Sequence, residues 1–288
     1  MSQVRDLIAL VKPRITLMVV ATGAVGLYLA PTTPKPETKL GLLLGMSLLV
    51  GGANALNMYL ERDIDGRAER TKDRPLPAGR LEPKIALALS LALGVLALLW
   101  LGLVVNLLTA VLGLVAFVSY TACYTPMKQV SPGALVIGAV PGAMPPLMGW
   151  TAARGEIGAG GLGLFGILFL WQIPHFLAIA WLYREQYAKA GFRMLPVVDP
   201  QGRATGWIAF LSSIALLVTS LVPMWVGVAG VAYGGGALAL GTLFAWASWR
   251  FTMDLDRQRA RMVFFASIIY LPLLLGLLMA DNVLQSIF

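Results

Sequence analysis

The chain has 288 residues, of which 58% are hydrophobic and only 12% are charged, and its formal net charge is +8. Soluble domains carry about 25% charged residues, so this composition excludes an ordinary soluble protein and indicates a polytopic membrane protein. A basic net charge can indicate a nucleic-acid partner. Here the distribution of the basic residues gives another explanation, and we expect no nucleic acid as partner.

Apolar segments follow one another along almost the whole chain. A stretch of about 20 apolar residues spans the hydrocarbon core of a bilayer. The sequence contains nine candidates, at about 15–30, 40–60, 85–104, 106–124, 134–151, 160–182, 207–222, 225–247 and 263–280. We therefore predict an all-α polytopic membrane protein of about nine transmembrane helices, forming a single domain over residues 1–288.

The connections between these segments differ in charge. Residues 1–14 and the loops at 61–84, 125–133, 183–206 and 250–262 hold 19 of the 22 Lys and Arg residues, which leaves Lys35, Lys39 and Arg154 on the other side. Because cytoplasmic loops carry an excess of Lys and Arg, the N-terminus is predicted inside and the C-terminus outside. The long charged loops indicate a functional site on the cytoplasmic side.

The two longest of these loops resemble each other. In each, acidic residues close the preceding helix and an Arg-x-Leu-Pro sequence follows, at 74–77 in the first loop and at 193–196 in the second. The two loops are four helices apart. This spacing predicts a pseudo-repeat of helices 1–4 and 5–8, followed by a ninth helix.

Three polar residues continue the second apolar segment at helical spacing. Asn57, Glu61 and Asp65 follow one another at intervals of four residues, so a helix presents them on one face at steps of about 6 Å. Such oxygen ligands suit Mg²⁺, which binds through one or two carboxylates and substrate phosphates. The arginines that follow suit phosphate oxygens. The alternative is a solvated helix end whose acids pair with nearby arginines, but ionisable residues at membrane depth favour a metal–diphosphate site.

Further candidates lie in the later loops and in the sixth segment. Glu185 ends the sixth segment as Glu61 ends the second, and it is predicted as a ligand for a second metal on the same diphosphate, with an interfacial helix end as the alternative. Lys128, the only charge of its short loop, is predicted to contact the diphosphate. His175, the only histidine of the chain, lies within the sixth segment, where helix packing and a ligand role are both open.

Several stretches of the sequence resemble one known family. They are LVKPRITLMVVATGAVGLYLA at 10–30, NALNMYLERDIDGRAERTKDRPLPAGR at 54–80, YTPMKQVSPGALVIGAVPGAMPPLMGW at 124–150, WQIPHFLAIAW at 171–181 and YAKAGFRMLPVV at 187–198. The chain resembles the UbiA superfamily of intramembrane prenyltransferases in its asparagine-led acidic motif. The GAMPPLMGW and PHF sequences are similar to those of the haem-farnesylating branch.

The resemblance implies nine helices around a central cavity, in which two acidic loops and a prenyl diphosphate hold Mg²⁺. The implied reaction transfers a farnesyl group from farnesyl diphosphate to a vinyl group of haem B, and water completes a hydroxyethylfarnesyl substituent. The implied residues are Asn57, Glu61, Asp65 and Lys128 for catalysis; Asn57, Glu61, Asp65 and Glu185 for the metal; Arg14, Arg70, Arg74, Tyr124 and Arg193 for the diphosphate; and His175 for the haem.

The sequence departs from the family pattern at two positions. Glu61 stands where the general motif has Asp, and the longer side chain still allows metal contact. Gln186 stands where an Asp is expected before Tyr187, which leaves Glu185 as the carboxylate of that part of the loop. The metal role of the second loop therefore depends on Glu185.

The sequence also leads to expectations about location, partners and alternative activities. The resemblance implies a bacterial plasma (inner) membrane protein in a lipid bilayer, with contact to haem A synthase or an oxidase assembly. Another acceptor, a quinone precursor or a chlorophyll-type molecule, is the main alternative. A CDP-alcohol phosphotransferase is disfavoured because DIDGRAER at 63–70 has the wrong spacing for that motif. A transporter is disfavoured because the spans lack ionisable residues at the midplane, apart from His175.

Overall fold

The computed structural model describes residues 3–67, 69 and 71–287. Within these residues the chain forms helices and connecting loops, and no strand. The helices are α1 (Gln3–Val11), α2 (Pro13–Leu29), α3 (Pro36–Asp65), α4 (Pro83–Trp100), η1 (Leu101–Val105), α5 (Leu107–Val118), η2 (Ser119–Tyr124), α6 (Thr125–Met127), α7 (Ala134–Arg154), α8 (Ala159–Leu182), α9 (Arg184–Lys189), α10 (Leu195–Val198), α11 (Arg203–Ser220), α12 (Val222–Trp225), α13 (Val231–Met253) and α14 (Arg257–Ile287).

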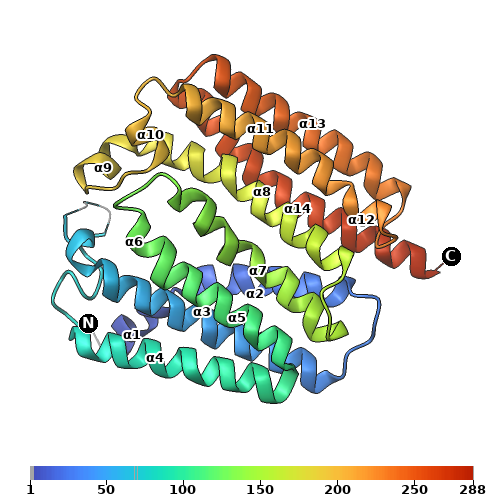
Figure 1. The fold of residues 1–288 in the computed structure, drawn as a ribbon, viewed down its shortest axis with the longest axis horizontal. Coiled ribbons are helices and arrows are strands. Elements are labelled where there is room, and N and C mark those ends of the chain that lie inside the picture. The colour runs from blue at the N-terminus through green and yellow to red at the C-terminus, as the bar shows by residue number, and fades with distance from the viewer. Residues whose placement is uncertain (1–2, 68, 70, 288) are drawn as a thin grey trace.

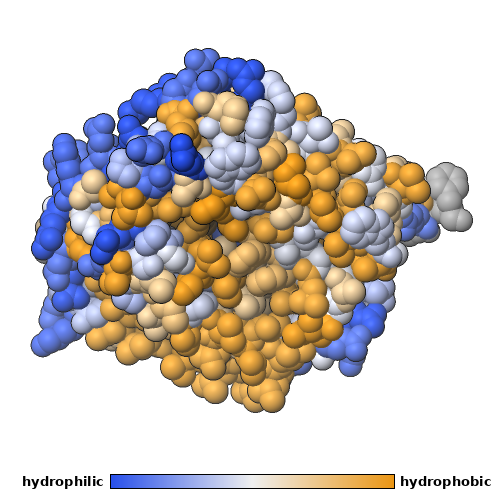
Figure 2. Space-filling view, turned by 45° about the horizontal axis from the view of Figure 1, so that its top comes forward, coloured by the Kyte–Doolittle hydropathy of each residue, from blue (hydrophilic) through white to orange (hydrophobic). Residues whose placement is uncertain are grey.

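Nine helical segments of the described residues are long and apolar enough to cross a membrane. They are α1 with α2, α3, α4 with η1, α5 with η2 and α6, α7, α8, α11 with α12, α13, and α14. Large apolar side chains such as Leu103, Leu107 and Val231 are exposed on them. Figure 2 shows a broad apolar surface with hydrophilic residues gathered mainly at one end. The all-α fold of nine spans is confirmed, and the chain is an integral membrane protein.

The first span differs from its predicted bounds. Helix begins at Gln3 instead of residue 15, and it is interrupted at Lys12, whose φ of 46° lies in the left-handed region. Pro13 follows at the first position of α2. Proline disfavours the helical conformation of the residue before it, which explains why α1 and α2 are separate helices.

The eighth span also differs from its predicted bounds of 225–247. It runs over Val231–Met253, because the chain turns at Gly227, whose φ is 76°. Asp281 of α14 then accepts hydrogen bonds from the backbone N–H of Gly230 at 2.5 Å and of Tyr233 at 3.2 Å, which fixes the start of α13. The residues from Gly227 to Gly230 therefore form the turn that leads into α13.

The helices form two groups that meet at α7 and α8. Figure 1 shows α2 to α7 in one half and α8 to α14 in the other. Helix α2 packs closely on α7: a Cβ atom on Gly26 would come within 2.0 Å of the Pro146 carbonyl oxygen, and one on Gly149 within 2.0 Å of the Gly23 oxygen. Only glycine permits this approach, which small residues commonly provide between membrane helices. The predicted four-helix repeat stays a prediction.

The two ends of the bundle differ. The N-terminal end of the chain, α9 and α10 lie at one end in Figure 1, and the C-terminus lies at the other. This placement is what an odd number of spans requires. That the first end faces the cytoplasm stays a prediction.

Candidate active site

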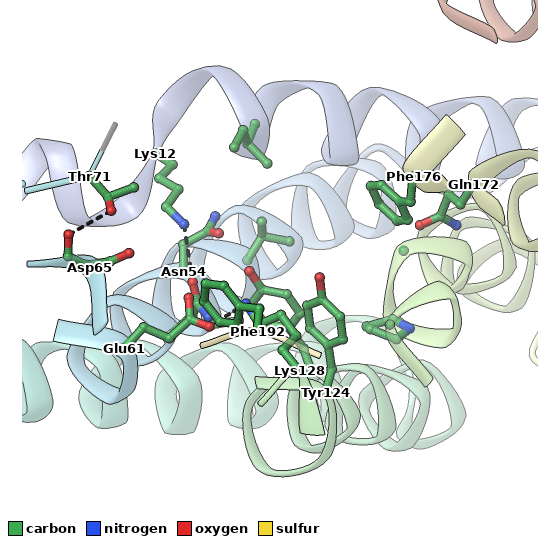
Figure 3. Close-up of a pocket in the computed structure, with 18 of the residues that line it drawn as sticks. Lys12, Asn54, Glu61, Asp65, Thr71, Tyr124, Lys128, Gln172, Phe176 and Phe192 are labelled. Carbon is green, nitrogen blue, oxygen red and sulfur yellow. Dashed lines mark hydrogen bonds and ion pairs between the residues drawn. The ribbon is translucent and has the colours of Figure 1, made fainter. Parts of the chain in front are cut away.

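A cavity of about 520 Å³ extends from the charged loops into the bundle. Its wall is built from α2, α3, α5, η2, α7 and α8, from Lys12 and Lys128 next to these helices, and from residues 183–194 and the loop at 71–74. Charged and amide side chains line the loop end, and mostly apolar side chains line the deeper part. Figure 3 shows Asp65, Glu61 and Lys12 at one end and Phe176 and Gln172 at the other.

The structure places all three members of the predicted acidic stripe in the cavity wall. Asn57, Glu61 and Asp65 project from one face of α3 and are buried, with exposed fractions of 3%, 5% and 5%. Asn54, one turn earlier, lines the same wall. Asp63, by contrast, is exposed and lies 3.7 Å from Arg62. The alternative of a solvated helix end therefore applies to Asp63, but not to Asn57, Glu61 and Asp65.

Each carboxylate of the stripe is paired with a basic side chain from another segment. Arg74 Nη1 donates to Asp65 Oδ2 at 2.5 Å, and Lys128 forms an ion pair with Glu61. The hydroxyl group of Thr71 donates to the Asp65 carbonyl oxygen at 2.8 Å, which holds the loop of Arg74 against the end of α3. Predicted metal and diphosphate residues are thus brought together at one end of the cavity.

Lys12 is a site residue that the sequence did not reveal. Its ammonium group reaches into the cavity and donates to Asn57 Oδ1 at 3.4 Å. The left-handed backbone at Lys12 is uncommon for a residue other than glycine, and such strain is often stored at functional sites. The one local signal was the following Pro13, which predicts a break in the helix.

Lys128 lies between aromatic rings at the same end. Its Nζ is 4.7 Å from the centre of the Tyr124 ring and 5.6 Å from that of Phe192. Burial alone would lower the pKa of Lys128, but Tyr124 and Glu61 outweigh it, and the pKa lies above the ordinary value of 10.5. Lys128 is therefore a permanent cation of the cavity at neutral pH.

The tyrosines of the wall come from a π-helical stretch. Helix α5 continues into η2, and its wider turn carries Tyr120 and Tyr124, whose rings stack at 5.7 Å and both line the cavity. Such stretches are rare and frequently occur at functional sites. A Cβ atom on Gly138 of α7 would approach the Tyr124 ring within 2.6 Å. Glycine at this position thus makes room for the aromatic wall.

Gln186, and not Glu185, faces the cavity. Tyr183, Gln186, Tyr187 and Ala190 line it at the spacing of one helical face, whereas Glu185 lies off this face and is exposed. The structure therefore does not support Glu185 as a metal ligand. The phase of this short helix is set at Tyr183, where α8 ends and α9 begins, so the sequence pattern alone does not show which face turns to the cavity.

Other predicted contacts lie outside the cavity wall. Arg14 is exposed, because Lys12, Ile15 and Val19 occupy the inner face of this segment. Arg193 is exposed and contributes only its backbone N–H, which donates to the Lys128 carbonyl oxygen at 2.8 Å.

The predicted site residues His175 and Arg70 are also absent from the described cavity wall. The structure does not place His175 among the described residues that line the cavity. Its side chain projects from α8 and packs against Phe264 and Ser267 of α14. Arg70 lies outside the described residues.

The donor set at the loop end fits Mg²⁺ only together with a substrate. Asn57, Glu61 and Asp65 offer oxygen ligands, but no group of three Asp, Glu, His or Cys side chains in the described part of the chain is arranged to hold a metal alone. Mg²⁺ usually binds through one or two carboxylates and takes its other ligands from water and phosphate. The residues therefore fit Mg²⁺ in a complex with a diphosphate.

The chain belongs to the UbiA prenyltransferase family, whose model matches residues 18–269. It is an enzyme, a prenyltransferase. Among similar proteins, protoheme IX farnesyltransferase from Anaeromyxobacter sp. (strain Fw109-5) is 48% identical over 270 residues, 94% of this chain and 91% of the relative. The protein of the same name from Myxococcus xanthus (strain DK1622) is 44% identical over 281 residues, 96% and 95% of the two chains. The resemblance seen in the motifs is confirmed.

Solved structures show the same fold at low sequence identity. A structure of digeranylgeranylglyceryl phosphate synthase superposes with a TM-score of 0.86 at 17% identity, covering 98% of this chain and 99% of the other. A UbiA homologue from Archaeoglobus fulgidus, bound to GPP and Mg²⁺, gives a TM-score of 0.72 at 16% identity and covers 95% and 99%. Membership of this family sets aside the CDP-alcohol phosphotransferase and transporter alternatives.

Proposed function

We propose that the protein transfers a farnesyl group from farnesyl diphosphate to a vinyl group of haem B. The observation that carries the proposal is the division of the cavity into a charged end and an apolar depth, which matches the two parts of a prenyl diphosphate. The acceptor is taken from relatives named protoheme IX farnesyltransferase. Those names favour haem over a quinone precursor or a chlorophyll-type acceptor.

The charged end would bind the diphosphate with one Mg²⁺. Among the described residues of the wall, Lys12, Arg74 and Lys128 supply three positive charges against the two carboxylates of Glu61 and Asp65, a net charge of +1. A phosphate monoester carries about −1.5 to −2 at pH 7, and a diphosphate ester carries at least as much, so one Mg²⁺ bound through the stripe suffices to balance it. A second Mg²⁺ would leave an excess of positive charge, and Gln186 offers it no carboxylate. The proposal therefore replaces the two-metal expectation with a single metal.

The residues of the wall then have distinct tasks in the reaction. The bond between the first prenyl carbon and the diphosphate oxygen breaks, and the metal, when bound, neutralises charge on the leaving group. Lys12, Arg74 and Lys128 stabilise the same developing charge from fixed positions, where electrostatic stabilisation is most effective. One vinyl carbon of the acceptor forms the new bond to the prenyl carbon, which leaves the positive charge on the other vinyl carbon. Water adds there and loses a proton, which the released diphosphate can accept, and the hydroxyl group of the product results.

The deeper wall protects the allylic cation that forms. Phe117, Tyr120 and Phe176 line this part of the cavity. Aromatic faces attract cations, by about 0.5–2 kcal/mol for each contact, and the apolar surroundings exclude water from the prenyl carbons. The wall thus favours attack by the acceptor over hydrolysis.

The cellular setting is part of the proposal. Bacterial relatives and the charge distribution support a plasma membrane location with the charged end in the cytoplasm. Contact with haem A synthase or an oxidase assembly stays a prediction.

Product analysis tests the proposed reaction. The chain is expressed in a bacterial membrane that makes haem B but cannot farnesylate it, and extracted haems are analysed by mass spectrometry. We expect a new haem with the mass of the hydroxyethylfarnesyl product, and none with an Asp65→Ala variant present at the same level. Folded wild-type protein that yields only haem B would overturn the assignment, and a prenylated quinone in its place would establish the alternative acceptor.

A further inference from the structure

Helix α1 is docked against the loop at 71–81, which lies between α3 and α4. Asp6 and Leu10, four residues apart on one face of α1, are buried, with exposed fractions of 5% and 0%. Leu10 belongs to an apolar cluster that also contains Leu76 and Leu81 of the loop. The first helix of the chain and this loop therefore share a small core.

Arg80 connects the loop to α1. Its Nε donates to Asp6 Oδ1 at 3.2 Å, and its Nη2 donates to the Asp73 carbonyl oxygen at 2.9 Å. Asp73 directly precedes Arg74 in the chain. One guanidinium group thus bridges α1 and the residue next to a cation of the cavity. Because the Asp6 side chain is only 7% exposed, its charge requires a partner within the protein.

Backbone hydrogen bonds connect Arg80 to Arg74 within a compact turn. The Ala78 N–H donates to the Arg74 carbonyl oxygen at 3.0 Å. The Arg80 N–H donates to the Pro75 carbonyl oxygen at the same distance of 3.0 Å. Gly79 turns the chain between them with a φ of 68°, in the region that favours glycine. The position of Arg74 therefore depends on that of Arg80.

At its other end, α1 leads directly into Lys12. The left-handed backbone of Lys12 is a strained conformation, which persists only where the surrounding structure fixes it. On the N-terminal side this structure is α1, which packs closely on α3: a Cβ atom on Gly51 would lie 3.3 Å from Val11 Cβ. The direction of the Lys12 side chain therefore depends on how α1 is docked.

The two cations that these segments carry face the same space. Lys12 and Arg74 both line the charged end of the cavity. Like charges repel each other, so the segments tend to separate when no anion lies between the two side chains. Side chains of α3 contact each cation separately. The ion pair of Asp6 with Arg80 connects the two segments directly.

We propose that Asp6 and Arg80 are positioning residues for diphosphate binding. Their ion pair holds α1 against the loop and thereby keeps Lys12 and Arg74 in the arrangement that a diphosphate requires. This inference rests on the proposed function, which places a diphosphate at the charged end of the cavity. Asp6 and Arg80 are not among the described residues that line the cavity, so they act through the two cations.

Binding of an unreactive substrate analogue tests the proposal without turnover. Calorimetry measures the affinity of the protein in nanodiscs for farnesyl S-thiolodiphosphate with Mg²⁺, and unfolding temperatures control for folding. Asp6→Ala/Arg80→Ala removes both charges and leaves neither unpaired, which destabilises less than removing one. We expect its affinity to fall roughly tenfold, the lower end of what the loss of an outer partner costs at metal sites.

A matched pair of single variants controls for the change in charge. Asp6→Ala should weaken binding roughly tenfold as well, and the Arg80 side chain that it leaves behind is 32% exposed and can be solvated. Asp73→Ala removes the same charge from an exposed position and retains the carbonyl oxygen that accepts from Arg80. Its affinity should stay within about twofold of wild type, as for most surface substitutions.

A double-mutant cycle shows whether Asp6 acts through Lys12. In a Lys12→Met background, the cation that Asp6→Ala displaces is already absent. The further loss of affinity from Asp6→Ala should therefore shrink to about threefold or less. A general loss of stability would instead lower the affinity by the same factor in both backgrounds.

The outcomes separate this inference from the proposed function. Wild-type affinity in folded Asp6→Ala/Arg80→Ala, or an equal loss in Asp73→Ala, would overturn the positioning role and leave the proposed reaction standing. Equal losses from Asp6→Ala with and without Lys12 would do the same. Wild-type protein that does not bind the analogue would overturn the diphosphate site and both proposals with it. The assay contains no acceptor, so the identity of the acceptor does not affect the result.

Discussion

Replacing Lys128 with Met removes a cation from the charged end of the cavity without adding a polar group. Lys128 is half-buried between Glu61, Tyr124 and Phe192. A hydrogen bond to a charged group contributes about 1.5–3 kcal/mol. Because 1.36 kcal/mol corresponds to a tenfold rate change, kcat/KM for farnesyl diphosphate should fall roughly 10- to 150-fold. The unpaired Glu61 should also lower the free energy of unfolding, by about 3–5 kcal/mol.

The assay uses purified protein in nanodiscs with haem B and radiolabelled farnesyl diphosphate, and thermal unfolding is followed in the same samples. Lys72→Met is the matched control, because Lys72 pairs with Glu69 on the exposed surface at 2.5 Å. Its kcat/KM should stay within twofold of wild type. A folded Lys128→Met enzyme with wild-type kcat/KM would refute the role of Lys128 at the diphosphate.

Three further predictions concern the same end of the cavity. Because the pKa of Lys128 is raised in the folded protein, the stability that its charge contributes is complete below pH 10.5 and falls as the pH rises above 10.5. The difference in unfolding free energy between wild type and Lys128→Met should therefore stay constant from pH 7 to 10. A decline of this difference within that range would contradict the raised pKa. Lys12→Met should raise KM for farnesyl diphosphate about tenfold, whereas Arg14→Met should leave it unchanged; equal effects would remove Lys12 from the site. Calorimetry with an unreactive diphosphate analogue should count one Mg²⁺ per protein and two for Gln186→Asp, and two in wild type would exclude the single-metal site.

Local periodicity explains what the sequence could predict. Asn57, Glu61 and Asp65 lie on one face of α3 because four-residue spacing returns to the same side of any helix. The nine spans could be predicted because lipid requires long apolar helices. Lys12 could not be placed in this way, since its direction depends on a left-handed backbone that interrupts the periodicity.

Other parts of the site depend on contacts between distant segments. The orientation of Gln186 and Glu185 is set by the irregular residue Tyr183 between α8 and α9, which resets the helical phase. The environment of His175 comes from α14, with Ser267 placed 92 residues further along the chain. The resemblance around His175 implied a role with haem, but only the packing of α8 against α14 shows that its ring lies off the cavity wall.

Asp65→Asn compared with Asp63→Asn tests most directly whether the buried stripe forms the diphosphate–metal site. The two residues differ by two positions in α3; Asp65 is buried beside Arg74, and Asp63 is exposed. Magnesium-dependent farnesyl transfer to haem B is measured for both purified variants, with unfolding temperatures as the control for folding. We predict that Asp65→Asn abolishes transfer and that Asp63→Asn retains it. Undiminished transfer by folded Asp65→Asn would contradict this prediction.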